Sequence, residues 1–167
     1  MTADGPPELT PVDCYRWINV LEGVQWHTAD VVLKMSPKHR PAARTIAGVS
    51  ARLPWWCDPD GSNLRPSTAR IAVACCVDIK TASAVLVILR ELGLIMLVSR
   101  GGRGKASQYQ LTVPSDLLDR VKRLTPAELT QRMRALDPPR PNRPPRSRRN
   151  TGGMPTGDQT AGPVDDR

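Results

Sequence analysis

The chain has 167 residues, of which 40% are hydrophobic but only 4% are aromatic, so it predicts one small domain with an aliphatic core and appended segments. Its net charge of +8 is concentrated in two parts of the sequence. Residues 37–113 hold eleven basic and four acidic side chains, and residues 114–149 hold ten and four. This distribution favours a polyanionic partner.

Several classes of protein are excluded by the cysteines and by the apolar runs. The four cysteines have neither the spacing of a disulfide framework nor that of a zinc site, so we expect reduced thiols in a cytoplasmic protein, with no metal and no cofactor. The first residues are acidic and proline-rich, which is not typical of an export signal. The most apolar stretch, residues 81–98, contains Arg90 and Glu91, and each would cost roughly 2.5–3.5 kcal/mol in a bilayer. A membrane span is therefore not expected.

The N-terminal part predicts two helices after a flexible lead-in. Within TPVD, Thr10 is expected as the N-cap, Pro11 as the first helical residue and Asp13 as the third residue after the cap, as in a capping box. This helix is expected to stop at Gly23. A second, shorter helix is expected within HTADVVLKMS, with Thr28 as its cap.

A third helical pattern follows two prolines. Apolar side chains recur there at helical spacing and are expected to form one buried face: Ala42, Ile46, Val49 and Leu53. The next segment, PWWCDPDGSNLRP, is dense in Pro, Asp and Gly and predicts a loop.

Two further helices are predicted by their capping residues. Ser67 is placed to cap a helix that begins at Thr68, and Asp78 is placed to cap a helix over residues 79–92. A tight break at Cys76–Val77 separates the two helices. Gly93 is placed to end the second one, because glycine tolerates the left-handed conformation common after a helix.

The segment LVSRGGRGKASQYQL, residues 97–111, predicts the loop of an antiparallel hairpin. It lies between the β-prone run LIMLVS and SQYQLTV, whose apolar and polar residues alternate. A nucleotide-binding phosphate loop would need a first glycine where Ser99 stands, a Ser or Thr where Ala106 stands, and a helix after it. The segment therefore is not expected to bind a nucleotide. The sequence also contains no convincing catalytic set, so we do not expect an enzyme.

The C-terminal part predicts two short helices and a tail. The helices are expected within SDLLDRVKRL and within TPAELTQRMRAL, where Thr125 and Glu128 repeat the capping-box pattern. From residue 137 onward the sequence is rich in Arg, Pro and Gly, and we expect a disordered tail that attracts phosphate groups non-specifically.

The segment from DPDGSNLRPSTARIAVACC to SRGGRGKASQYQLTVP resembles the winged helix-turn-helix domains of small actinobacterial regulators and of plasmid or phage replication initiators. The resemblance covers residues 40–113, less than half of the chain. It is carried by Asp60–Gly61, Pro66–Ser67, Ile71–Ala72, Val77–Asp78 with Thr81, Leu89, Leu92–Gly93–Leu94–Ile95 and the glycine-rich basic loop.

The resemblance implies a mainly α fold with a small antiparallel β-hairpin, arranged as a winged helix-turn-helix with helical extensions. The predicted organisation is a flexible lead-in (1–9), an N-terminal helical extension (10–36), the winged helix-turn-helix domain (37–113), C-terminal helices (114–136) and a disordered Arg/Pro-rich tail (137–167).

The resemblance also implies that the chain binds double-stranded DNA. The start of the helix over residues 79–92 would enter the major groove, the preceding helix would contact phosphate, and the hairpin would reach a minor groove or the backbone. The residues implied are Thr68, Arg70, Lys80, Thr81, Ser83, Arg100, Arg103 and Lys105.

The sequence departs from the family pattern on the third helix of the domain. Relatives often carry Arg, Lys or Gln on its exposed face, where this chain has Ala84 and Val87, with Ile88 close by. Three interpretations are open for these side chains: they are core, they make a weak DNA contact, or they form an apolar strip that binds a second copy or another protein.

We therefore expect a cytoplasmic, non-enzymatic DNA-binding protein, acting as a transcription regulator or as a DNA-replication accessory of a bacterial plasmid, phage or other mobile element. The alternative is a winged helix used as a protein-interaction module through its apolar third helix.

Overall fold

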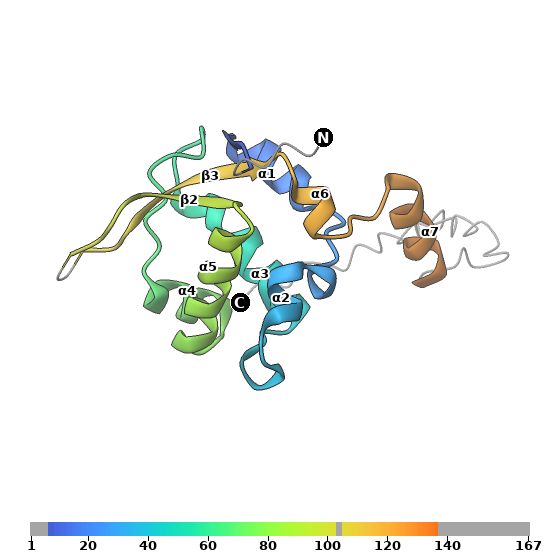
Figure 1. Ribbon diagram of the computed structural model, residues 1–167, viewed down its shortest axis with the longest axis horizontal. Coiled ribbons are helices and arrows are strands. Elements are labelled where there is room, and N and C mark those ends of the chain that lie inside the picture. Colours follow the sequence, from blue (N-terminus) through green and yellow to red (C-terminus); the bar gives the residue numbers. More distant parts are fainter. Residues whose placement is uncertain (1–6, 103–104, 137–167) are drawn as a thin grey trace, which may run out of the picture.

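The computed structural model describes residues 7–102 and 105–136 and is mainly helical, with a small antiparallel sheet (Figure 1). The mainly α class with a hairpin is thus confirmed. The tail predicted after residue 136 and the first six residues of the lead-in lie outside the described residues.

The elements are β1 (Leu9–Pro11), α1 (Cys14–Leu21), η1 (Trp26–Thr28), α2 (Asp30–Lys34), η2 (Pro37–His39), α3 (Ala43–Arg52), η3 (Leu53–Trp56), α4 (Thr68–Cys75), α5 (Ile79–Glu91), β2 (Ile95–Ser99), β3 (Gln108–Pro114), α6 (Leu117–Arg120) and α7 (Pro126–Leu136).

The first helix begins later than the capping pattern predicts. Thr10 and Pro11 belong to β1, which pairs antiparallel with β3 and holds their backbone extended. The N-cap of α1 is Asp13, whose carboxylate accepts a hydrogen bond from the Arg16 N–H at 2.8 Å. The prediction for the helix end is confirmed, because Gly23 has a φ of +80° just after the helix.

Thr28 does not cap the second helix. Its hydroxyl donates to the Gln25 carbonyl at 2.7 Å and accepts the Lys122 N–H at 2.9 Å. Residues 26–28 form the turn η1, and α2 begins only at Asp30, after Ala29. The Thr28 hydroxyl, which the local sequence predicts as a helix cap, therefore binds the backbone of residue 122 instead.

The helices α3, α4 and α5 agree closely with the sequence. Ile46, Val49 and Leu53 are fully buried, whereas Ala42 precedes α3 and is exposed. Ser67 accepts the Arg70 N–H at 3.1 Å and Asp78 accepts the Thr81 N–H at 2.8 Å, so both predicted caps are confirmed.

A short turn joins α4 to α5. Cys76, at the break, is in the left-handed conformation with a φ of 52°. The helix direction changes by 109° across this turn. Gly93 follows α5 with a φ of +73°, as expected.

The sheet has the strand order β1-β3-β2, and β3 is paired along both sides. Ile95 faces Leu111 and Leu97 faces Tyr109 across the hairpin, and Leu64 makes an isolated bridge to Tyr109 from the other side. In Figure 1 the β2–β3 hairpin extends away from the helices, and α2 to α5 lie below the sheet. Thr112, on the face expected to be polar, is buried and donates to the Gly93 carbonyl at 2.7 Å.

The core lies between α5, the sheet and the N-terminal helices. Ile88, Leu92 and Leu111 are fully buried in it. Trp17 is also fully buried, and its indole N–H donates to the Leu94 carbonyl at 2.9 Å. The core is thus shared by α1 and by the elements that follow residue 37, and α1 is not a separate appendage.

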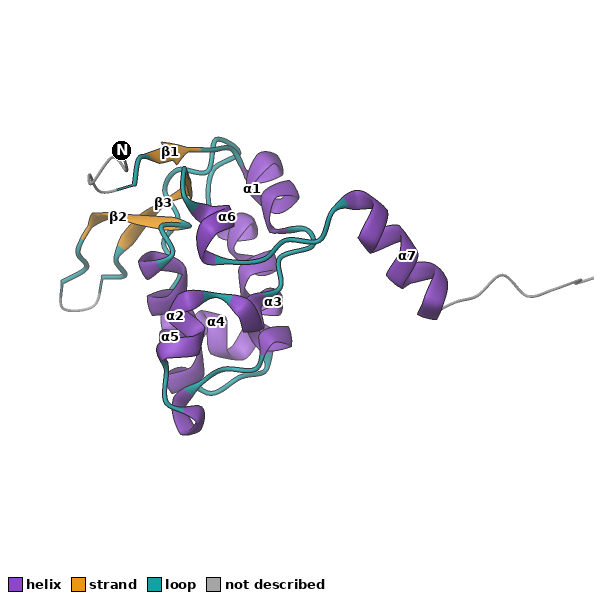
Figure 2. Cartoon of the chain, turned by 45° about the vertical axis from the view of Figure 1, so that its right-hand side comes forward, coloured by secondary structure: helices purple, strands orange, loops and turns teal. Residues whose placement is uncertain are grey.

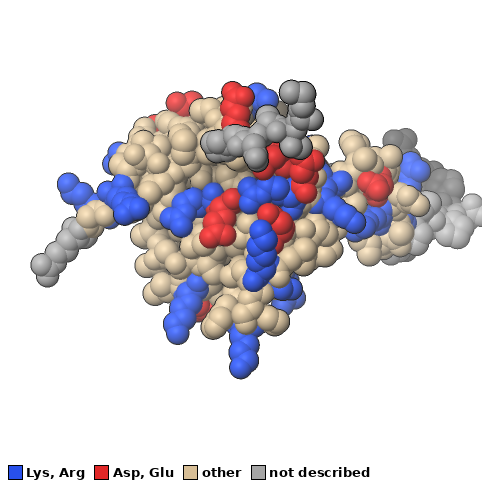
Figure 3. Space-filling view, in the orientation of Figure 1, with Lys and Arg blue, Asp and Glu red and all other residues tan. Residues whose placement is uncertain are grey.

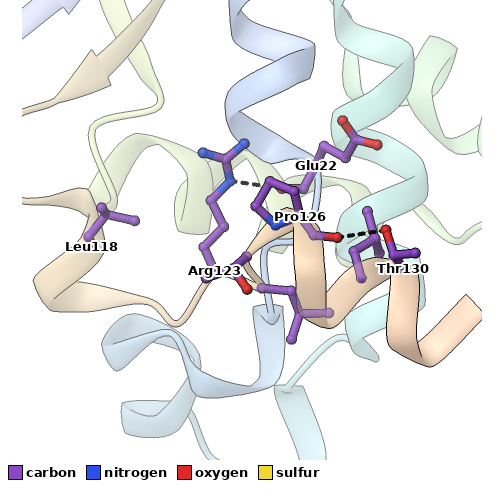
Figure 4. Close-up of a pocket in the computed structure, with 8 residues that line it drawn as sticks. Glu22, Leu118, Arg123, Pro126 and Thr130 are labelled. Atoms are coloured by element: carbon purple, nitrogen blue, oxygen red, sulfur yellow. Dashed lines mark hydrogen bonds between the residues drawn. The ribbon is translucent and has the colours of Figure 1, made fainter.

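The C-terminal helices differ in how they pack. The segment SDLLDRVKRL gives only the short α6, because Arg123 then forms an isolated bridge with Val24. A hollow of about 430 Å³ lies beside this connection, where the Arg123 side chain donates to the Glu22 carbonyl at 2.9 Å (Figure 4). The capping box of α7 is confirmed, with the Thr125 N–H donating to Glu128 at 2.8 Å. Figure 2 shows α7 standing apart from the other helices.

None of the helices in the described part of the chain is, taken singly, long and apolar enough to cross a membrane.

Candidate functional site

The exposed face of α5 forms a stripe between two hollows. The exposed positions recur every three or four residues, whereas Ala82, Val85 and Leu89 face the core and are fully buried. We call the exposed set the α5 stripe; it consists of Ile79, Lys80, Ser83, Val87, Arg90 and, at its C-terminal end, Glu91. Lys80 and Ser83 therefore lie on the surface, as the sequence predicts.

Thr81 also takes part in the cap of α5. Its hydroxyl donates to the Asp78 carboxylate at 2.6 Å, and its side chain is half-buried. The hydrogen bonds from the Thr81 hydroxyl and backbone lower the pKa of Asp78 below its ordinary value. Thr81 thus completes the cap of α5, and its only hydroxyl proton is already used there.

The first hollow, of about 350 Å³, separates the start of α5 from the turn η2. Lys38 and His39 line it opposite Lys80 and Thr81. Arg40 also lines it, but its guanidinium donates to the Leu33 and Met35 carbonyls at 3.0 Å each and so ends α2. Residues of η2 were not expected in the site, although the basic residues that follow Pro37 are a signal that the sequence contains.

The second hollow, of about 390 Å³, lies between α4, α5 and residues 105–109 of the hairpin. Thr68, Leu86 and Lys105 line it together, so the structure joins two of the predicted residues across 37 positions of sequence. Since successive helical residues are about 100° apart, Leu86 and Ala84 lie on opposite edges of the α5 stripe. The stripe is therefore flanked by η2 on one side and by the hairpin on the other.

The hairpin presents further basic groups. Arg100 and Lys105 are exposed, whereas Arg103 lies outside the described residues. Gly101 is required for the tight loop, because a Cβ there would come within 2.1 Å of the Lys105 carbonyl oxygen. At the loop end of the β2–β3 ladder, Arg65 donates to Gln108 at 2.9 Å, and Arg65 was not among the residues expected from the sequence.

Arg70 is exposed, and its guanidinium contacts an aromatic ring of the same molecule. Its guanidinium lies 5.5 Å from the ring centroid of Trp56, in a cation–π contact. Arg70 lines neither of the two hollows beside the α5 stripe, whereas Thr68 lines the second.

The apolar side chains that depart from the family pattern do not form one exposed strip. Ile88 is fully buried in the core, Ala84 is half-buried, and Val87 is 37% exposed. Of the three interpretations, the core interpretation is thus confirmed for Ile88, and a surface that includes Ile88 is excluded.

Basic side chains border the face of the molecule seen in Figure 3, whereas Asp and Glu side chains lie among Lys and Arg near its centre. Figure 3 shows Lys and Arg side chains on the hairpin next to its tip and along the lower edge, below α4, α5 and α2. Among the described residues, the ion pairs are confined to Asp30, which contacts Lys34 at 3.8 Å and Arg120 at 3.3 Å. The basic groups around the α5 stripe are therefore available to an anionic partner.

The described residues contain no group of three His, Cys, Asp or Glu side chains close enough to hold a metal ion, and their four cysteines are free thiols. Comparisons with protein-family models, with curated proteins and with solved structures find no match. The candidate site therefore rests on the side chains of this chain alone: the α5 stripe and the basic groups on both sides of it.

Proposed function

We propose that residues 37–113 form a winged helix-turn-helix domain that binds double-stranded DNA. The observation that carries this proposal is the relation between α4 and α5. They meet at 109° across the three residues Cys76 to Asp78, within the range of roughly 90–120° typical of a helix-turn-helix. The β2–β3 hairpin directly follows α5, in the position of a wing, and Leu64, which precedes α4, adds an isolated bridge to Tyr109 of β3.

The α5 stripe would enter the major groove, and the flanking basic groups would contact phosphates. Four side chains of the stripe can form hydrogen bonds, Lys80, Ser83, Arg90 and Glu91, and only Lys80 and Ser83 lie in the first half of the helix, so few base edges can be read directly. Thr68, Lys105 and Lys38 border the stripe and are suited to phosphate contacts. Affinity would therefore come mainly from the backbone of the duplex.

We further propose that the protein acts in the cytoplasm as a transcription regulator or as a replication accessory of a bacterial plasmid, phage or integrated element. This role follows from the resemblance of residues 40–113 to domains of that kind. The alternative, a protein-interaction module with an apolar third helix, has less support because Ile88 is buried.

The test compares two variants with the same loss of charge. In the first, Arg100, Arg103 and Lys105 of the hairpin are replaced by Ala. In the second, three basic residues of the C-terminal part are replaced by Ala: Lys122, Arg132 and Arg134. Both proteins are titrated onto a mixed-sequence duplex and onto duplexes recovered from a random library.

We expect the hairpin variant to lose at least tenfold in duplex affinity, while the control variant stays within about twofold of the parent. Circular dichroism would establish that both variants are folded. Equal losses in the two variants, or no binding by the parent chain, would overturn the proposal.

A further inference from the structure

A second basic surface follows one face of α3 and is separate from the α5 stripe. Arg44, Gly48 and Arg52 recur at intervals of four residues, and they line one wall of a groove of about 550 Å³. The other wall comes from the end of α4 and the turn after it, and includes Ala74, Cys75 and Cys76. We call it the α3 groove.

The α3 groove is cationic and open. Its lining contains two arginines and no carboxylate: Arg44, Thr45, Gly48, Val49, Arg52, Ala74, Cys75, Cys76 and Val77. The two carboxylates of the loop between η3 and α4 form hydrogen bonds within that loop. Asp58 accepts from Asn63 at 2.6 Å, and Asp60 accepts from the Ser62 N–H at 2.9 Å. Arg44 and Arg52 are separated by eight residues, or about 12 Å along a helix.

Gly48 contributes no side chain to the middle of the groove wall formed by α3. It lies inside α3, where glycine disfavours the helix relative to other residues, and it is exposed. A Cβ at this position would meet nothing within 4 Å. Packing therefore does not require the glycine, whereas a chain that lies along the groove could approach the helix backbone there.

An exposed aromatic ring contacts Arg52 at the end of α3 but is not itself part of the groove lining. Trp55 is three residues beyond Arg52 and is 74% exposed, which is unusual for so large an apolar side chain. The Arg52 guanidinium lies 5.1 Å from its ring centroid. A stacked cation covers one face of an indole and leaves the other face free for a second planar group.

We propose that the α3 groove binds a single nucleic-acid strand. Arg44 and Arg52 would contact two phosphates of the same strand, and an unpaired base would stack on Trp55. Basic side chains that follow the backbone, together with an aromatic platform for a base, are the features by which proteins bind single strands. This site is independent of the proposed duplex site, because neither Arg44 nor Arg52 lines the hollows beside the α5 stripe.

The experiment measures the binding of a fluorescein-labelled 12-mer of thymidine, with a 12-mer of uridine as the second probe and an unlabelled duplex as competitor. Replacing Trp55 by Ala should weaken binding of the 12-mer by roughly 5- to 150-fold, as expected for the loss of one base–aromatic stack. Affinity for the duplex should stay within twofold. The 12-mer that binds with higher affinity identifies the preferred strand as DNA or RNA.

A matched pair of variants tests the groove without altering Trp55. Gly48→Glu would place a carboxylate between the two arginines, and Gly48→Gln would place a neutral side chain of the same size there. Both residues favour a helix over glycine, so both variants should fold. We expect Gly48→Glu to lose at least tenfold more affinity for the 12-mer than Gly48→Gln.

The two proposals fail separately. Loss of duplex binding in the hairpin variant, with 12-mer binding retained, supports both sites. A chain that binds the 12-mer through Trp55 but binds no duplex overturns the proposed function alone. Binding of the 12-mer that is unchanged in both Trp55→Ala and Gly48→Glu, or a parent chain that binds neither 12-mer, overturns the α3 groove.

Discussion

The Sγ atoms of Cys14 and Cys57 lie 3.2 Å apart, although the two residues are separated by 43 positions in the sequence. Cys14 opens α1, and Cys57 follows η3. Both thiols lie near the Pro54 carbonyl oxygen, at 3.7 Å for Cys14 and 3.4 Å for Cys57. The contact joins the N-terminal helix to the loop that leads toward α4.

This contact predicts a disulfide under oxidising conditions. The sulfur atoms need to approach only to about 2.05 Å, and two exchange steps with oxidised glutathione would yield the disulfide and two molecules of reduced glutathione. Closing a loop of this length should raise the free energy of unfolding by at most about 4 kcal/mol. A mass decrease of about two hydrogens, peptide mapping and a higher Tm would establish the bond.

The control is Cys14→Ser, which should keep its Tm under the same oxidant. Mapping of the bond to Cys75 or Cys76, or only to a second chain, would contradict the prediction.

Cys57 also predicts a loss of stability at alkaline pH. Burial, followed by the hydrogen bond and the charge of Cys14, raises the pKa of its thiol from 9.0 to about 12. Between these values only the unfolded chain releases the proton, so the free energy of unfolding should fall as the pH rises from 9 towards 12. Below pH 9 the protonated Cys57 thiol makes its full contribution to the free energy of unfolding. Urea unfolding at several pH values should show a smaller alkaline decrease for Cys57→Ser, and equal decreases would refute the assignment.

Ile88 and Val87 are adjacent in α5 but should respond differently to truncation. Ile88→Ala removes a fully buried side chain and should cost about 2–5 kcal/mol of the free energy of unfolding. Val87→Ala alters a side chain that is 37% exposed and should change this value by less than about 1 kcal/mol. Chemical denaturation measures both. Similar small costs would mean that Ile88 is not part of the core in solution.

Ser67 should stabilise the start of α4, and with it the position of Thr68 at the edge of the duplex site. Ser67→Ala removes the acceptor of the Arg70 N–H and should cost about 0.5–2 kcal/mol, whereas Ser67→Asp keeps an acceptor and should cost less. Thermal unfolding of the two variants provides the comparison. A cost for Ala no larger than that for Asp would rule out the capping role.

Duplex binding should depend strongly on salt. With about five phosphate contacts, the logarithm of the association constant should fall with the logarithm of the salt concentration at a slope near −4 to −5. Isotherms at four or five salt concentrations measure this slope. The hairpin variant should show a slope shallower by two or more, and a slope near zero for the parent chain would contradict a phosphate-dominated interface.

The features that could be predicted from the sequence are those fixed by neighbouring residues. Ser67, Asp78 and Gly93 define the ends of α4 and α5 through hydrogen bonds or backbone angles within a few residues, and the structure confirms each one. The alternation in β3 was also visible, but not that Thr112 is buried, because its partner is the distant Gly93 carbonyl.

The features that could not be predicted depend on contacts between residues far apart in the sequence. Pro11 reads as a helix start, yet its strand pairs with residues about 100 positions later. Thr28 reads as a cap, yet its hydroxyl bonds the backbone of Lys122. For the candidate site, the basic side chains were visible, but Lys38 and His39 were not placed beside Lys80, because only the packing of α2 against α5 brings them together.

The strand order of the sheet also bears on how the protein behaves at high concentration. One outer strand, β1, has only three residues and ends with Pro11, which has no N–H to offer. The other, β2, has a break in its register between Leu97 and Ser99. Since β3 is paired on both sides, neither outer strand offers a neighbouring molecule an unbroken row of backbone donors and acceptors, and the sheet should resist fibril growth by edge-to-edge addition.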